Sequence, residues 1–209
     1  MRKSAILNLN RAKFFETIAK NKFVIGTLFC YVLGIVLGVV CTTKSTKVLE
    51  IARSDFSSYL TGRNGMPFFN GVLGNFFELL PMCLVIFICG TSVVGVVLIP
   101  IAVCYCGFEY GIVTAFLYRQ YLLQGIAFNS LILIPSTLLA ILGYILLSKE
   151  AFGFSIQLLK ASMPGFTNQD FYLGLKGYSK HFFIIIFVFL LSALADSLLS
   201  LAFLGFFNF

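Results

Sequence analysis

Charged residues and the residue types of common catalytic motifs are scarce in this chain of 209 residues. Asp, Glu, Lys and Arg together make up 11% of the sequence, whereas about 25% is usual for a soluble domain. The chain has no Trp and a single His, His181. HExxH, GxSxG and Walker sequences are also missing. These absences exclude a separate soluble catalytic domain, and we expect a protein that is not an enzyme and uses no cofactor.

The cysteines lack the spacing of a metal site or a disulfide framework. All six lie within or at the edge of apolar segments and form no CxxC pair: Cys30, Cys41, Cys83, Cys89, Cys104 and Cys106. Buried free cysteine behaves as a small apolar residue. We therefore predict neither a bound metal nor a disulfide.

Apolar residues, in contrast, dominate the chain. They make up 59% of it, against about 45–50% in an ordinary soluble domain. A membrane span takes about 20 apolar residues. The runs predict an all-α, polytopic transmembrane helix bundle, a single integral membrane domain over residues 1–209 with the lipid bilayer as its main partner. The five predicted spans are about 23–41, 76–91, 96–117, 126–147 and 182–204.

Two connecting segments are long enough to be described separately. Residues 42–75 are predicted to form an outer loop, and the segment MPFFNGVLGNFFELLP at its end resembles an interfacial approach to the membrane. Residues 148–180 are predicted to form a cytoplasmic loop. Within it, AFGFSIQLLKA has the apolar spacing of a helix lying along the cytoplasmic leaflet.

The distribution of Lys and Arg predicts the orientation. Cytoplasmic flanks are richer in these residues, and an N-terminus inside and a C-terminus outside gives the larger share to the cytoplasm. The inner segments then hold Arg2, Lys3, Arg11, Lys13, Lys20, Lys22, Lys149, Lys160, Lys176 and Lys180, and the outer ones hold Lys44, Lys47, Arg53, Arg63 and Arg119. Because these bases are scattered among apolar runs, the net charge of +7 reflects topology, and we expect no nucleic-acid partner.

Small residues at helical spacing predict close helix packing. In the first span Gly26, Gly34 and Gly38 share one face with Cys30. Further candidates for helix packing are Gly90 and Gly95 around a turn, and Gly107 and Gly111 in the third span. Such a stripe fits packing within the protein or a homodimer, and the sequence leaves both open. Kinks are expected at Pro81, Pro100 and Pro135.

Polar residues inside the spans predict a crevice. Ser192, Asp196 and Ser200 share one face of the last span, Glu109 lies in the third, and Asn129 lies near the start of the fourth. Charged groups in a bilayer face protein or water because exposure to lipid is costly. We predict an outward-open polar crevice lined by Asp196, Glu109 and Asn129. The alternative is that these groups only satisfy one another as buried structural pairs.

From residue 90 onward the order of short motifs resembles the stage II sporulation protein M family of Gram-positive spore-formers. The motifs are GTSVVG at Gly90–Gly95, GFEYG at Gly107–Gly111, AFNSLILIP ending at Pro135, and the segment FSIQLLK, followed by an acidic residue at Asp196. Two positions depart from the family pattern. Phe128 replaces a usual Pro, and Glu109 stands where the family is usually apolar.

The resemblance implies a non-enzymatic scaffold in the cell membrane. Such a protein localises a peptidoglycan-degrading complex, with the stage II sporulation proteins D and P, during engulfment of the forespore. Its expected contact surface comprises residues 42–75 and the outer ends of the second to fifth spans, with Asp196 and Asn129 central. The alternatives are a permease or transporter subunit for a small solute, or an envelope protein of the same family with no part in sporulation.

Overall fold

A computed structural model describes residues 22–61, 68–161 and 168–207, all of them in helices and short turns. The elements in chain order are α2 (Lys22–Lys44), α3 (Thr46–Thr61), α4 (Phe68–Gly90), α5 (Gly95–Phe128), a π-helix (Asn129–Leu133), α6 (Ile134–Ala161), α7 (Asn168–Phe203) and a 3-10 turn (Leu204–Phe206). No strand occurs in the described ranges. The predicted all-α helical bundle is therefore confirmed.

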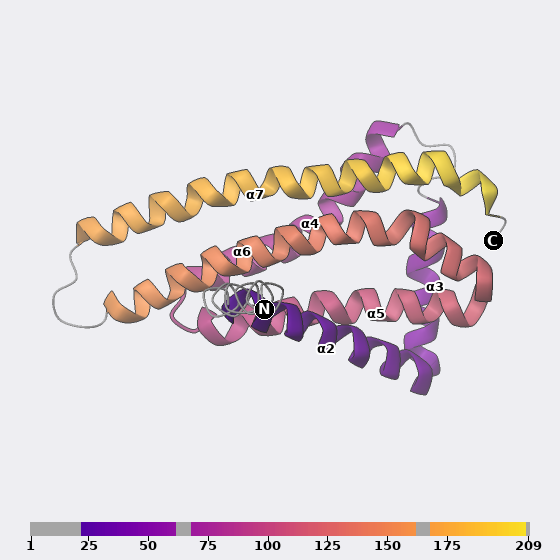
Figure 1. The fold of residues 1–209 in the computed structure, drawn as a ribbon, viewed down its shortest axis with the longest axis horizontal. Helices are drawn as coiled ribbons and strands as arrows, with labels where there is room; N and C mark the ends of the chain where they lie inside the picture. Colours follow the sequence, from indigo (N-terminus) through magenta and orange to yellow (C-terminus); the bar gives the residue numbers. More distant parts are fainter. Residues whose placement is uncertain (1–21, 62–67, 162–167, 208–209) are drawn as a thin grey trace, which may run out of the picture.

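The long helices run back and forth along one axis, and α3 lies across one end of the bundle, called here the α3 end (Figure 1). Four described segments are long and apolar enough to cross a membrane: Lys22–Lys44, Phe68–Gly90, Gly95–Ala161 and Tyr172–Phe206. The chain is thus a multi-pass membrane protein. The third segment has 67 residues and contains both α5 and α6, which run in opposite directions (Figure 1). Length and hydropathy therefore give four candidate spans, and the predicted third and fourth spans are the two arms of one doubled-back segment.

The segment predicted as an outer loop, residues 42–75, is mostly helical. It contains α3 and the first two turns of α4, which begins at Phe68 instead of near residue 76. Helix α3 forms because its apolar residues recur on one face, where Ala52 and Phe56 are buried. The Phe56 ring packs against Phe116 and Phe128, with ring centroids 5.7 and 5.6 Å apart. Tertiary burial of this face turns a polar connection into an ordered cap on the α3 end.

The predicted cytoplasmic loop, residues 148–180, is also largely helical. Helix α6 continues to Ala161 and α7 begins at Asn168, so AFGFSIQLLKA extends α6 and is not a separate helix along the membrane surface. Aromatic packing explains the extension: the Phe154 ring stacks on Tyr178 of α7 with centroids 5.0 Å apart. His181 Nδ1 also lies 2.8 Å from Glu150 Oε2. Contacts between α6 and α7 thus continue beyond the predicted spans.

The reversal between α5 and α6 depends on two backbone irregularities. Leu122 has a positive φ of 45°, and Gly125 returns against the Leu117 carbonyl, where a Cβ would overlap it. The π-helix follows directly and ends before Pro135. Pro135 has no N–H, so it cannot donate a helical backbone bond. At the residue before it, the Ile134 N–H bonds the Asn129 carbonyl five residues back, which is the spacing of a π-helix. The chain therefore bends at Leu122 and before Pro135. Pro81 lies inside α4, and Pro100 lies in α5 before its break at Leu122.

Glycines hold α2 and α5 close together. A Cβ on Gly34 or Gly38 would overlap the backbone of α5, and one on Gly107 or Gly111 would overlap the backbone of α2. These two pairs form a reciprocal contact within the chain. The predicted Gly26 does not take part, since a Cβ at this position would meet no other atom within 4 Å. At the other predicted pair, Gly90 packs against Ala151 and Tyr178, and Gly95 packs against the Cys89 carbonyl.

Candidate functional site

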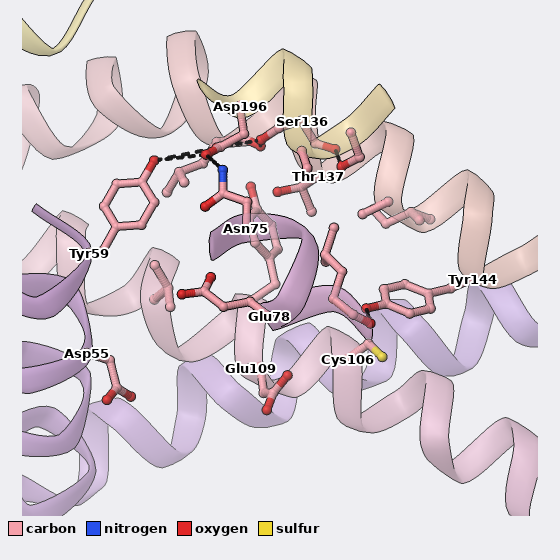
Figure 2. A pocket seen from close by; sticks show the side chains of 18 of the residues that line it. Asp55, Tyr59, Asn75, Glu78, Cys106, Glu109, Ser136, Thr137, Tyr144 and Asp196 are labelled. Carbon is pink, nitrogen blue, oxygen red and sulfur yellow. Dashed lines mark hydrogen bonds between the residues drawn. The ribbon is translucent and has the colours of Figure 1, made fainter. Parts of the chain in front are cut away.

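A cavity of about 660 Å³ opens among the helices near the α3 end. Side chains from all six described α-helices line it, and Figure 2 shows them around a common space. Its polar lining combines acids and hydroxyl-bearing rings: Asp55, Glu78, Glu109, Asp196, Tyr31, Tyr59, Tyr110 and Tyr144. Leu79, Ile141 and Ala140 contribute apolar wall. The cavity thus brings together residues that are up to 165 positions apart in the sequence, between Tyr31 and Asp196.

Asp196 is the most buried of the four acids, with 8% of its surface exposed. Asn75 Nδ2 of α4 donates to its Oδ2 at 2.6 Å, and Ser136 Oγ of α6 donates to its Oδ1 at 3.0 Å. The Tyr59 hydroxyl of α3 lies 3.3 Å from Oδ2 and 3.1 Å from Ser200 Oγ. Figure 2 shows these donors converging on the carboxyl group. One side chain of α7 therefore ties three other helices together.

The two serines that flank Asp196 have separate partners. Ser192 Oγ donates to the Ser136 carbonyl at 2.8 Å, which adds a second link between α7 and α6. Ser200 does not belong to the cavity lining, but it is 2% exposed and bonds Tyr59. The predicted polar face of the last helix consequently points into protein along its length.

The other three acids come from different helices and are more open. Asp55 of α3, Glu78 of α4 and Glu109 of α5 are all exposed at the cavity. Glu109 lies on the opposite side of α5 from the Gly107–Gly111 pair, as its spacing of two residues predicts. Among the described residues no three His, Cys, Asp or Glu side chains are close enough to hold a metal ion. The acids therefore surround a space and do not converge on one point.

Asn129 differs from its prediction. It is 1% exposed and does not line the cavity. Its Oδ1 accepts from the Tyr110 hydroxyl at 3.1 Å, and its Nδ2 donates to the Tyr118 hydroxyl at 2.9 Å. Because it opens the π-helix, the side chain is turned toward α5. Asn129 thus braces the α5–α6 reversal and supports the cavity only through Tyr110.

The predicted crevice and the observed cavity share Asp196, Glu109 and Ser192. Much of the remaining polar lining was not predicted from the sequence, namely Asp55, Tyr59, Asn75 and Ser136. Two of these lie in α3 and one at the start of α4, in the segment expected to be a loop. The spacing of Ala52, Phe56 and Tyr59 on one helical face was the signal that could have placed Tyr59 near the bundle.

This arrangement suits binding more than covalent chemistry. Carboxylates and tyrosine hydroxyls supply hydrogen-bonding and negatively charged groups, while aromatic and aliphatic walls supply apolar contact. Comparison of the chain with family models, with curated proteins and with solved structures gave no match.

Proposed function

We propose that this chain is a non-enzymatic scaffold of the bacterial cell membrane that localises a peptidoglycan-degrading complex during forespore engulfment. Its partners would be the stage II sporulation proteins D and P. The proposal rests on the resemblance of residues 90–209 to the stage II sporulation protein M family, together with the multi-pass helical fold.

The observation that carries the proposal is the structural role of the resembling residues. Gly107 and Gly111 permit the close contact of α5 with α2. Pro135 follows the π-helix at the reversal, and Asp196 ties four helices together. The residues that carry the resemblance thus shape the bundle, which favours a protein that acts by holding others in the membrane.

The outward face of α3 is the proposed contact surface. Glu50, Arg53, Ser54 and Ser57 are exposed and recur at spacings of three and four residues, opposite the buried Ala52. Since α3 is anchored on α5 by Phe56, this polar face is presented in a fixed position. Residues 62–67 of the predicted contact segment 42–75 lie outside the described residues.

Co-purification from sporulating cells tests this proposal. The tagged chain should retain both wall-degrading partners, and Arg53→Glu should reduce their recovery several-fold. Lys149→Glu makes the same change of charge at the opposite end of the bundle, where Lys149 is exposed, and should leave recovery unchanged. Failure of the wild-type chain to retain either partner would contradict the proposal.

The cavity favours a second candidate, a permease or transporter subunit for a small solute. Intramembrane acids next to a cavity are common on solute pathways. Uptake or efflux that depends on this chain, in vesicles lacking the wall-degrading proteins, would support the second candidate over the scaffold. An envelope role in the same family but outside sporulation would be recognised by expression during vegetative growth.

A further inference from the structure

We propose that the cavity is a binding site for a small organic dication, a molecule whose two ammonium or guanidinium groups are joined by an apolar linker. Such a site is additional to the scaffold role and does not depend on it.

The first argument is the sign and placement of charge. Asp55 of α3 and Glu109 of α5 are exposed at the cavity and reach it from different helices. Glu78 enters from α4, and Figure 2 shows the three carboxylates at separate places around the cavity. The described lining residues include no Lys, Arg or His. An entering cation is attracted by several carboxylates at once, and the low-dielectric walls of a helical bundle strengthen that attraction.

The separation between the carboxylates indicates how the positive charges of the ligand are arranged. Within the described ranges no three acidic, His or Cys side chains approach closely enough to bind one metal ion. A single compact charge therefore contacts only part of the lining. A molecule with two separated positive groups can meet Asp55 and Glu109 together, which enter the cavity at separate points (Figure 2).

A second, independent observation comes from Tyr31 on α2. This tyrosine is 5% exposed and lines the cavity, yet its hydroxyl forms no hydrogen bond with any other described residue. The hydroxyl lies near Tyr110 and Cys106, which line the same cavity. Because Tyr31 lines the cavity, its hydroxyl oxygen is available to a donor that enters there. An ammonium or guanidinium N–H in the cavity would donate to this oxygen.

The walls suit the linker of such a ligand. Tyr31, Tyr110 and Tyr144 present aromatic rings, and Leu79 and Ile141 present aliphatic groups. Aromatic faces attract organic cations, and apolar walls cover methylene groups. The volume of about 660 Å³ lies within the range of small-molecule sites.

Asp196 has a different role in this proposal. Its oxygens already accept from Asn75, Ser136 and Tyr59. It fixes the helices that form the wall, whereas Asp55 and Glu109 contact the ligand. Substitution of these two acids should therefore change binding without loss of the fold.

Isothermal titration of the full chain in lipid nanodiscs tests the proposal, with cadaverine as the probe. Cadaverine should bind, while n-pentylamine, with one ammonium group, should bind at least about tenfold more weakly, or about 1.4 kcal/mol. Pentanediol, which has the same linker and no charge, should not bind. Glu109→Gln and Asp55→Asn should each weaken cadaverine about tenfold. Tyr31→Phe should weaken it several-fold by removing only the hydroxyl.

Glu150→Gln is the matched control, because it removes an acid in the second half of α6, outside the cavity lining. Its affinity for cadaverine should equal that of the wild type. Each variant should keep the wild-type thermal unfolding midpoint, so that lost binding reports on contacts. Absence of cadaverine binding, equal binding of n-pentylamine, or unchanged binding by both Glu109→Gln and Asp55→Asn would each overturn the proposal.

Discussion

The bond between Asn75 and Asp196 should contribute measurably to the stability of the bundle. A double-mutant cycle with Asn75→Ala and Asp196→Ala isolates this pair from the other contacts of both residues. The Nδ2–Oδ2 distance is 2.6 Å, and Asp196 is 8% exposed. Side-chain hydrogen bonds measured this way in a membrane protein average about 0.6 kcal/mol and reach about 1.7 kcal/mol. The short distance and the carboxyl acceptor place this pair near the upper limit, at about 1.5 kcal/mol.

The single variants should differ in the cost of substitution. Asp196→Ala removes the acceptor of three donors, but the Ser136 hydroxyl can donate to the Ile132 or Leu133 carbonyl instead, and the Tyr59 hydroxyl keeps its contact with Ser200 Oγ. We expect a loss of about 2–3 kcal/mol in the free energy of unfolding, mainly from the lost short bond to Asn75, whose Nδ2 keeps a longer contact with Ser197 Oγ of α7 at 3.4 Å.

The free energy of unfolding is measured by titration of SDS into the protein in mixed micelles. A control cycle pairs Asn75→Ala with Tyr178→Phe, whose hydroxyl bonds the Phe87 carbonyl elsewhere in the bundle. Its coupling should be zero within about 0.5 kcal/mol. A coupling for Asn75 and Asp196 no larger than that of the control would refute the role assigned to Asp196 as the tie between helices.

Three further outcomes follow from the packing. Gly107→Val should destabilise the protein by about 1–3 kcal/mol, because its side chain would meet the α2 backbone, while Gly26→Val should be nearly neutral by the same SDS titration. With a membrane-impermeant maleimide added to intact cells, Glu109→Cys should be labelled and Asn129→Cys should stay unlabelled; the reverse pattern would contradict the placement of these residues. Tyr178→Phe should cost about 1 kcal/mol, with ring stacking retained, and no change in the SDS midpoint would count against its bond to α4.

The long apolar helices could be predicted because a chain that crosses a bilayer has no water to bond its backbone groups. A run such as Phe23–Cys41 must satisfy its backbone groups internally, and only a helix does so in a single pass. Helix α3 could not be predicted as readily, since its polar composition conceals an apolar face. That face is buried only because the fold places Phe116 and Phe128 beside Phe56. The reversal at Leu122 falls between the predicted spans 96–117 and 126–147, but its positive φ could not be predicted, because leucine rarely adopts one.

The sequence predicts only some of the residues that line the cavity. Asp196 and Glu109 stand out because acids are rare within apolar runs, and both line the cavity. Asn129 stands out equally but points to Tyr110 and Tyr118, and no pattern in the sequence distinguishes a bracing amide from a lining one. Asn75 was overlooked because its neighbours were expected to lie outside the helices.

Deletion of this chain in a spore-forming host, followed by fluorescent staining of membranes during sporulation, tests the proposed scaffold role most directly. The proposal predicts cells that complete the asymmetric septum but fail to extend the mother-cell membrane around the forespore, with recovery when the wild-type chain is restored. Normal engulfment in the deleted strain would contradict it.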